Sequence, residues 1–154
     1  LHKAIRRQRQ MCIRDRNKGM MSSNSNEWAT PIKFFEELNK EFKFTLDPCA
    51  TKDNAKCKKY YTKEDDGLTR NWIGERVFCN PPYGREIHNW VRKCYEENKL
   101  NNTFIVMLIP ARTDTSYFHD YIYHKQEIRF IRGRLKFNDG KNPAPFPSMV
   151  VIFK

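Results

Sequence analysis

Four consecutive residues, Asn80, Pro81, Pro82 and Tyr83, place an amide, a carbonyl and an aromatic ring in one stiff segment. Each proline fixes its own φ and lacks an N–H donor, and Pro81 also disfavours helical backbone angles at Asn80. The Asn80 side-chain oxygen and the Pro81 carbonyl oxygen are two acceptors for the N–H groups of an exocyclic amine. Such an amine is a poor nucleophile because its lone pair is delocalised into the ring. Two acceptors favour the positive charge that builds up on nitrogen as it attacks an electrophilic carbon.

The Tyr83 ring suits the same substrate, because aromatic side chains stack on unpaired bases. The structural alternative is a proline loop with a tyrosine that fills space beneath it. The apolar run 77–79 directly before the tetrapeptide is typical of a buried strand that stops where the prolines begin. The sequence therefore predicts that the tetrapeptide lies at the carboxyl end of a strand, where open α/β sheets bind ligands.

The tetrapeptide resembles the Asn/Asp-Pro-Pro-Tyr motif of amino-group methyltransferases. Four further blocks accompany it in order: Trp-Ala-Thr-Pro at 28–31, Leu-Asp-Pro-Cys-Ala at 46–50, Pro-Ala-Arg-Thr-Asp-Thr at 110–115 and Arg-Gly-Arg-Leu-Lys-Phe at 132–137. Together the five blocks resemble the small DNA N6-adenine methyltransferases of phages and prophages. The resemblance covers about Glu27 to Lys154, which is most of the chain.

The resemblance implies a reaction and a partner. The methyl group of S-adenosylmethionine would pass to the N6 amine of adenine in DNA, after the base has been swung out of the duplex. Asn80 and Pro81 would orient the amine, Pro82 would stiffen the loop and Tyr83 would stack on the base. No metal is implied.

The resemblance also implies residues for the cofactor S-adenosylmethionine. Trp28, Thr30 and Pro31 would close over its methionine part, although Trp28 could equally be a packing anchor. Asp47 would form hydrogen bonds with the cofactor from the end of the first strand. Residues 49–51 stand where many methyltransferases have a glycine-rich turn.

An acidic turn follows a short expected strand at 60–62. Asp65 and Asp66 are candidates to accept hydrogen bonds from a ribose or an adenine amine, and Asp66 is assigned to the cofactor. The alternative is an acidic surface turn.

Four cations are assigned to DNA. Arg112 directly follows an apolar run, where its charge needs a partner such as a phosphate or the carboxylate of Asp114. Arg132, Arg134 and Lys136 would share one side of an extended segment and form a track for phosphates.

Two other classes of function stay open. Related tetrapeptides occur in methyltransferases of RNA bases and of protein glutamine amides, since a planar amide nitrogen poses the same chemical problem. The basic track favours nucleic acid over protein. A non-catalytic DNA-binding module is the third reading, and it predicts no affinity for the cofactor.

The 154 residues suffice for one domain. Of the formal net charge of +11, residues 1–21 carry seven Lys/Arg and one Asp, a net +6, which leaves +5 for the rest. We expect residues 1–26 to be an unstructured or foreign segment, with the natural start at Met20 or Met21, and residues 27–154 to be the methyltransferase domain. A nucleic-acid-binding basic arm is the competing reading of the first segment.

The chain has five cysteines and no Cys-x-x-Cys pair, namely Cys12, Cys49, Cys57, Cys79 and Cys94. An odd number of cysteines without this spacing favours reduced thiols over a disulfide framework or a zinc site. No apolar run approaches the roughly 18–20 residues of a membrane span. These observations favour a cytoplasmic protein, and the resemblance to phage enzymes implies the cytoplasm of a bacterial host. We expect a monomer or a homodimer.

The hydrophobic pattern predicts a single Rossmann-like α/β domain with a mostly parallel sheet and an antiparallel final strand. One expected helix begins at Pro31, with Thr30 as its N-cap. Three others are expected to cover residues 52–59, 86–99 and 113–124. Expected strands cover 42–46, 104–109, 127–132 and 149–153. Only about 30 residues separate Asp47 from Asn80. One βαβ unit alone takes about 30, so we expect the sheet to be trimmed.

Overall fold

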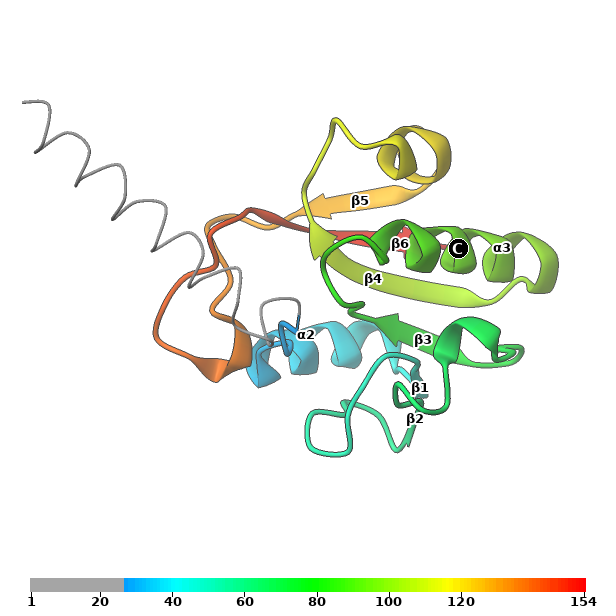
Figure 1. Cartoon of the computed structure of the whole chain (residues 1–154), viewed down its shortest axis with the longest axis horizontal. Coiled ribbons are helices and arrows are strands. Elements are labelled where there is room, and N and C mark those ends of the chain that lie inside the picture. The colour runs from blue at the N-terminus through cyan, green and yellow to red at the C-terminus, as the bar shows by residue number, and fades with distance from the viewer. Residues whose placement is uncertain (1–26) are drawn as a thin grey trace, which may run out of the picture.

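The computed structural model describes residues 27–154 (Figure 1), and the expectations for residues 1–26 lie outside this part of the chain. The helices are α2 (Ile32–Phe42) and α3 (Ile87–Asn101). The strands are β1 (Leu46–Asp47), β2 (Lys59–Tyr60), β3 (Arg76–Cys79), β4 (Phe104–Pro110), β5 (Glu127–Phe130) and β6 (Ser148–Phe153). Three short turns complete the fold: 3₁₀ turns at Gly67–Thr69 and Phe137–Asp139, and a π-helical turn at Phe118–Ile122.

The six strands form one sheet in the order β2-β1-β3-β4-β6-β5. The pairs β1/β2, β1/β3 and β3/β4 are parallel, whereas β6 is antiparallel to both β4 and β5. This arrangement confirms the predicted α/β fold with a mostly parallel sheet and an antiparallel final strand. The carboxyl ends of β1, β3 and β4 meet at one edge, as parallel pairing requires.

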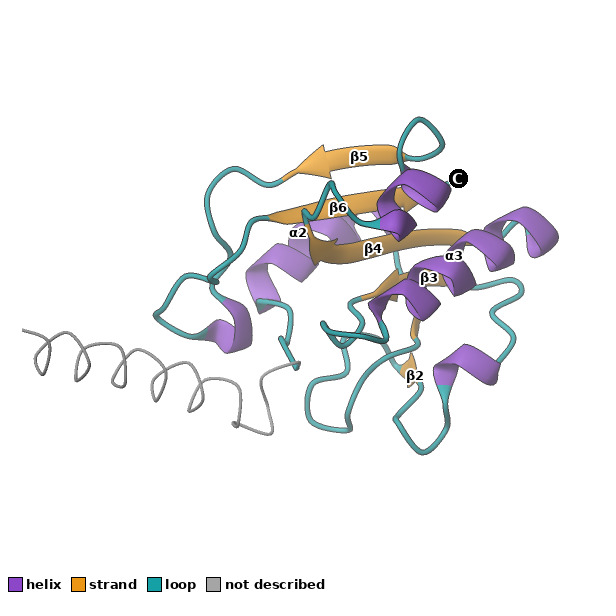
Figure 2. Cartoon of the chain, turned by 45° about the horizontal axis from the view of Figure 1, so that its top comes forward, coloured by secondary structure: helices purple, strands orange, loops and turns teal. Residues whose placement is uncertain are grey.

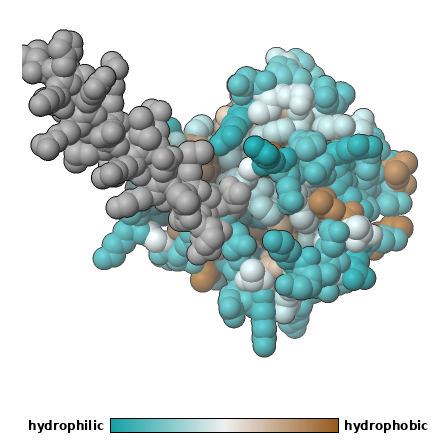
Figure 3. Space-filling model, in the orientation of Figure 1, coloured by the Kyte–Doolittle hydropathy of each residue, from teal (hydrophilic) through white to brown (hydrophobic). Residues whose placement is uncertain are grey.

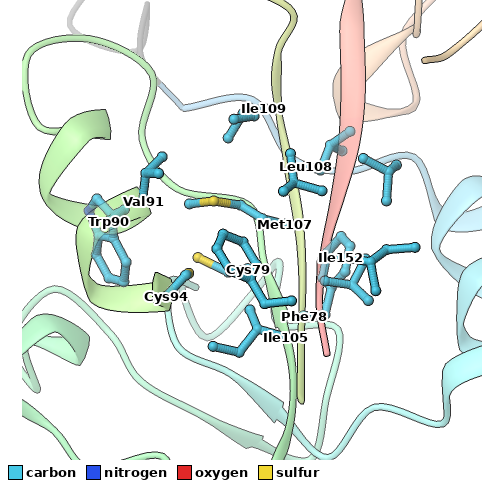
Figure 4. Close-up of a cluster of buried hydrophobic side chains, with 14 of the residues drawn as sticks. Phe78, Cys79, Trp90, Val91, Cys94, Ile105, Met107, Leu108, Ile109 and Ile152 are labelled. Carbon is cyan, nitrogen blue, oxygen red and sulfur yellow. The ribbon is translucent and has the colours of Figure 1, made fainter. Parts of the chain in front are cut away.

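The two helices cover opposite faces of the sheet, and Figure 2 shows α2 behind it and α3 in front. Alternation along β3 explains how one strand contacts both helices. Phe78 packs edge-on against Phe35 of α2, with ring centroids 5.1 Å apart. The neighbouring side chain of Cys79 lies among the buried residues of α3, including Trp90 and Cys94 (Figure 4).

The first strand is shorter than predicted. The alternation at 42–46 suggested a strand, but Phe42 is the last buried residue of α2. Lys43 then turns left-handed at φ 54°, and its N–H donates to the Asn39 carbonyl at 2.9 Å. The Asn39 side chain accepts the next N–H, from Phe44, at 2.8 Å. These two bonds end the helix and leave only Leu46–Asp47 for the strand.

The predicted helix at 52–59 was wrong, and the predicted helix at 113–124 is shorter than expected. Residues 52–58 form turns and bends, and Lys59 already belongs to β2. The Asn54 side chain accepts the N–H of Thr51, and the Thr51 hydroxyl accepts the N–H of Asn54. Side chains that bind nearby backbone in this way compete with helix formation. The segment 113–124 is helical only over residues 116–122, and most of this part is the π-helical turn, which the Tyr123 N–H closes onto the Phe118 carbonyl, five residues back, at 2.7 Å.

The visible face of the domain is largely hydrophilic, and small apolar patches are scattered over it (Figure 3). Within residues 27–154 no helix combines the length and hydrophobicity that a membrane crossing needs. The four cysteines of this part of the chain are free thiols.

Candidate active site

The tetrapeptide 80–83 follows β3 directly, as the sequence predicted, and lies at the edge where the parallel strands end. Two distant segments meet it there. One is residues 28–32, which lead into α2. The other is residues 137–147, between β5 and β6, which we call the site loop. Figure 1 shows the start of α2 beside this loop.

The Asn80 amide has a fixed orientation. Its Nδ2 donates to the Trp28 carbonyl and to Thr30 Oγ1, the latter at 2.9 Å. A carbonyl can only accept, so the NH₂ end of the amide must face Trp28. Asn80 Oδ1 is buried and, within residues 27–154, has no hydrogen-bond partner. A buried acceptor without a partner costs free energy, and this one lies in the tetrapeptide directly after β3.

Thr30 therefore has a different role from the predicted helix cap. Helix α2 begins at Ile32, with Pro31 as the preceding cap residue, and no side chain of that cap residue bonds the helix. The Thr30 hydroxyl accepts from Asn80 instead. Of the three residues that the resemblance assigned to the cofactor, Trp28 and Thr30 thus contact the tetrapeptide, and Pro31 joins them to α2.

Pro81 supplies a second acceptor beside the first. Pro81 is buried, and its carbonyl oxygen accepts no hydrogen bond from the described part of the chain. Pro82 is half-buried, and Gly84 follows Tyr83 at φ 144°, where residues with a side chain are strained. The loop therefore turns sharply after the four residues.

Tyr83 is a core residue in this structure, only 5% exposed. Its hydroxyl donates to the Leu108 carbonyl of β4 at 3.2 Å. Its ring is nearly perpendicular to Phe137 and Phe146 of the site loop, with centroids 6.0 and 5.5 Å away. Burial holds the pKa of the Tyr83 phenol well above its usual range, so the hydroxyl remains a donor.

Trp28 completes this group of rings. It lies edge-on to Phe137 at 5.6 Å and to Phe146 at 5.2 Å. We call Trp28, Tyr83, Phe137 and Phe146 the aromatic cluster. Sequence reasoning gave neither Phe137 nor Phe146 a part in the site. The available signal was an aromatic residue at each end of a proline-rich loop.

Asp47 lies at the end of β1, as predicted, and only 4% of it is exposed. Its Oδ1 accepts the N–H of Cys49 at 3.3 Å and its Oδ2 accepts the N–H of Lys56 at 3.1 Å. These bonds shape the loop that replaces a glycine-rich turn. Burial raises the pKa of Asp47 to about 6, and the two backbone donors oppose this only in part. No ion pair reaches this carboxylate within residues 27–154.

The structure separates the two acids of the predicted turn. Asp65 Oδ2 accepts from the backbone and hydroxyl of Thr62 at 2.9 and 3.0 Å, and these bonds lower the Asp65 pKa. Asp66 is exposed, and its side chain has no such bond in the described chain. Gly67, beside it, packs so closely on the Pro48 carbonyl that a Cβ would lie 2.1 Å from that oxygen. Asp66 is therefore held next to the Asp47 loop.

The predicted cations are exposed, but they do not form one straight row. Gly133 has φ 77°, and the chain bends at residues 132–133, so Arg132 is not part of one extended segment with Arg134 and Lys136. Arg134 donates to the Ala144 carbonyl at 3.4 Å and so also supports the site loop.

Arg112 is also exposed, and the predicted pair with Asp114 does not form. Within residues 27–154, the side chains of Arg112, Arg132 and Lys136 make no hydrogen bond or ion pair. Their charges are available to a partner.

A buried hydroxyl was missed by the sequence reasoning. Ser148 begins β6 opposite Pro110, at the same edge, and its Oγ lacks a partner in the described chain. Residues 27–154 contain no group of three or more His, Cys, Asp or Glu side chains that could hold a metal ion.

Comparison with known proteins adds an independent line of argument. The sequence profile of a family described as "DNA N-6-adenine-methyltransferase (Dam)" matches residues 18–154. A DNA N-6-adenine-methyltransferase of Haemophilus phage HP1 is 31% identical over 140 residues, which cover 86% of this chain and 80% of the phage protein. A protein of the same name from Escherichia phage T1 is 34% identical over 110 residues, 70% of this chain and 45% of the phage protein.

Proposed function

Because the chain belongs to the DNA N-6-adenine-methyltransferase (Dam) family, we propose that it methylates the N6 amine of adenine in DNA, with S-adenosylmethionine as the methyl donor. The observation that supports this most directly is Asn80 Oδ1, a buried acceptor without a partner in the described chain. An adenine amine has two N–H groups, and these can donate hydrogen bonds to this oxygen and to the Pro81 carbonyl.

The two acceptors act on the nucleophile. Hydrogen bonds from the amine to Asn80 Oδ1 and the Pro81 carbonyl stabilise the positive charge that develops on N6 during attack. They also hold the amine in one orientation, which removes much of the entropic cost of the reaction. Proton loss to solvent after the transfer completes the change at nitrogen. No side chain of unusual basicity is required.

The residues present fit the cofactor. S-adenosylmethionine is cationic at its sulfonium and amino groups, and when bound it supplies an electrophilic methyl group. Asp47 is a buried carboxylate with no ion pair in the described chain, so a cation beside it would favour its charged form. The exposed carboxylate of Asp66 is suited to ribose hydroxyls, and residues 28–31 lie against Asn80, where the donor and the amine must meet.

The target base must reach the aromatic cluster. A base inside a duplex is stacked and paired, so it has to be flipped out before its amine can approach Asn80. Tyr83 is covered by Phe137 and Phe146, and the base would take over ring contacts that these residues make in the free protein. The relatives are phage proteins, and we place the reaction in the host cytoplasm, where phage DNA is present.

The substrate class is tested by label transfer. The protein is incubated with tritiated S-adenosylmethionine and, separately, unmethylated duplex DNA, ribosomal RNA or bulk protein, and the digested products are identified. We expect label in N6-methyladenine from DNA. Label in RNA or in glutamine would assign the same chemistry to another substrate. Absence of label in every arm, together with no cofactor binding by calorimetry, would leave only a non-catalytic DNA-binding module.

Cofactor binding should depend on pH through Asp47. Its pKa of about 6 lies above the ordinary 3.8, so the folded protein holds this proton more tightly than the unfolded chain. Between these two values the contribution of Asp47 to the free energy of unfolding falls as pH rises. A bound cation reverses this preference, because it stabilises the ionised carboxylate.

We therefore expect the gain in Tm at saturating S-adenosylmethionine to be larger at pH 7 than at pH 5. The measurement is a series of thermal melts with and without cofactor across this range. Asp47→Asn should flatten the dependence. A gain that grows toward pH 5, or one that Asp47→Asn leaves unchanged, would remove Asp47 from the cofactor site.

Binding to DNA should fall as salt is raised, because cations that contact phosphates release counterions. Lys136→Ala should lower the slope of log affinity against log salt by about one unit if Lys136 contacts a phosphate. Lys40→Ala is the matched control, since Lys40 is exposed in the last turn of α2, away from the tetrapeptide. Equal slopes for the two variants would place the DNA elsewhere on the surface.

A further inference from the structure

Two consecutive residues of the site loop adopt an unusual backbone. Asn138 has φ 58° and Asp139 has φ 49°, both in the left-handed region that side chains disfavour. Asn and Asp tolerate this region better than other residues with side chains. The conformation turns both side chains toward one segment of the chain, residues 28–32.

Three hydrogen bonds join this turn to that segment. Asn138 Oδ1 accepts the N–H of Ala29 at 3.0 Å, and the Asn138 N–H donates to the Ala29 carbonyl at 2.8 Å. Asp139 Oδ1 accepts the N–H of Ile32, the first residue of α2, at 3.0 Å. Ala29 and Ile32 lie on either side of Thr30 in the sequence. Their bonds to the turn at 138–139 therefore hold the backbone that carries the Thr30 side chain.

The same stretch orients the reacting amide. Asn80 Nδ2 has its two acceptors there, the Trp28 carbonyl and Thr30 Oγ1. If the stretch moves away, the amide is free to rotate by half a turn. Its NH₂ group would then face the incoming amine, so that two hydrogen-bond donors would oppose each other. Its oxygen could no longer accept a hydrogen bond from the amine.

From these bonds we propose that Asn138 and Asp139 are positioning residues, which hold Trp28 and Thr30 in place so that Asn80 Oδ1 faces the target amine. This inference rests on the proposed function, because it assumes that Asn80 binds that amine. It adds a role for two exposed loop residues that form no hydrogen bond with the tetrapeptide in the described chain. Neither residue was singled out in the sequence.

The test separates the side-chain oxygen from the backbone conformation. Asn138→Gly keeps the left-handed turn but removes the acceptor, whereas Asn138→Asp keeps both. We expect Asn138→Gly to lower kcat for label transfer to DNA about tenfold or more, with KM for DNA within about twofold, since misplacing a reacting group acts on the chemical step. Asn138→Asp should restore kcat. Asn142→Gly is the control, an exposed asparagine of the same loop that makes no hydrogen bond in the described chain.

A second readout needs no catalysis. Hydrogen exchange of the Asn80 side-chain NH₂, followed by NMR in the ligand-free protein, reports directly on its two bonds. The resonance is assigned by its loss in Asn80→Ser. We expect exchange to be about tenfold faster in Asn138→Gly and unchanged in Asn138→Asp and Asn142→Gly.

The outcomes distinguish the two proposals. Wild-type protein that does not label adenine but shows the exchange pattern would overturn the proposed function alone. Wild-type kcat together with a protected Asn80 amide in folded Asn138→Gly would overturn the positioning role alone. A loss of activity that Asn138→Asp does not restore would also overturn it. If Asn138→Gly does not fold, Asp139→Gly with Asp139→Asn as its rescue decides the question by the same criteria.

Discussion

Asn80→Ala should lower kcat for methyl transfer to adenine about a thousandfold. Removing one preorganised hydrogen-bonding group that acts on a developing charge costs about 10²–10³ in rate. Asn80 also ties the Trp28 carbonyl and Thr30 to the loop, so its loss disturbs the donor side of the site as well. We therefore expect cofactor affinity to weaken, but by less than about tenfold, because only hydrogen bonds are removed on that side.

The rate is measured with saturating DNA and tritiated cofactor, and the affinity by calorimetry. Asn89→Ala is the matched control, since Asn89 is exposed on α3 and its side chain makes no hydrogen bond in residues 27–154. A variant that stays folded and transfers methyl groups at more than about a tenth of the wild-type rate would show that the amide is not the principal acceptor.

Tyr83→Ala should destabilise the domain by about 3–5 kcal/mol, the usual cost of truncating a buried aromatic residue. The sequence analysis assigned the Tyr83 ring to base stacking and kept a space-filling tyrosine as the alternative. The ring, however, packs against Phe137 and Phe146 beneath the site, and its hydroxyl bonds the Leu108 carbonyl. The free energy of unfolding, measured by urea denaturation, reports the loss.

Tyr83→Phe separates the two roles of this residue. It keeps the ring and removes one hydrogen bond, which is worth about 1 kcal/mol. We expect this variant to methylate DNA at a rate within a few-fold of wild type. If Tyr83→Ala were no less stable than Tyr83→Phe, the ring would not belong to the core, and its role would be confined to the substrate.

Local patterns were enough to predict the frame of the site. The run 77–79 followed by two prolines correctly placed Asn80 at the end of a strand, and the apolar run 104–109 gave the central strand β4. The same holds for Asp47 at the end of β1. In each case the signal lies within a few residues of the feature, because burial and proline geometry act locally.

The partners of these residues could not be predicted, since they come from far along the chain. Thr30 preceding proline fits the pattern of a helix cap, but Asn80, 50 residues away, binds its hydroxyl. The bond between Asn138 and Ala29 spans 109 residues. The burial of Tyr83 likewise depends on Phe137 and Phe146, which no spacing rule connects with the tetrapeptide.

That long-range bond has a consequence for the order of events during synthesis. Contacts between residues far apart in sequence form late, because the intervening chain must first be ordered. A ribosome makes Asn80 well before Asn138, and β6, which lies between β4 and β5, comes later still. We expect a nascent chain to hold an unoriented Asn80 amide until the site loop has emerged. Methylation of DNA would then begin only once the site loop has packed against residues 28–32, so we expect truncated translation products that lack the loop to be inactive.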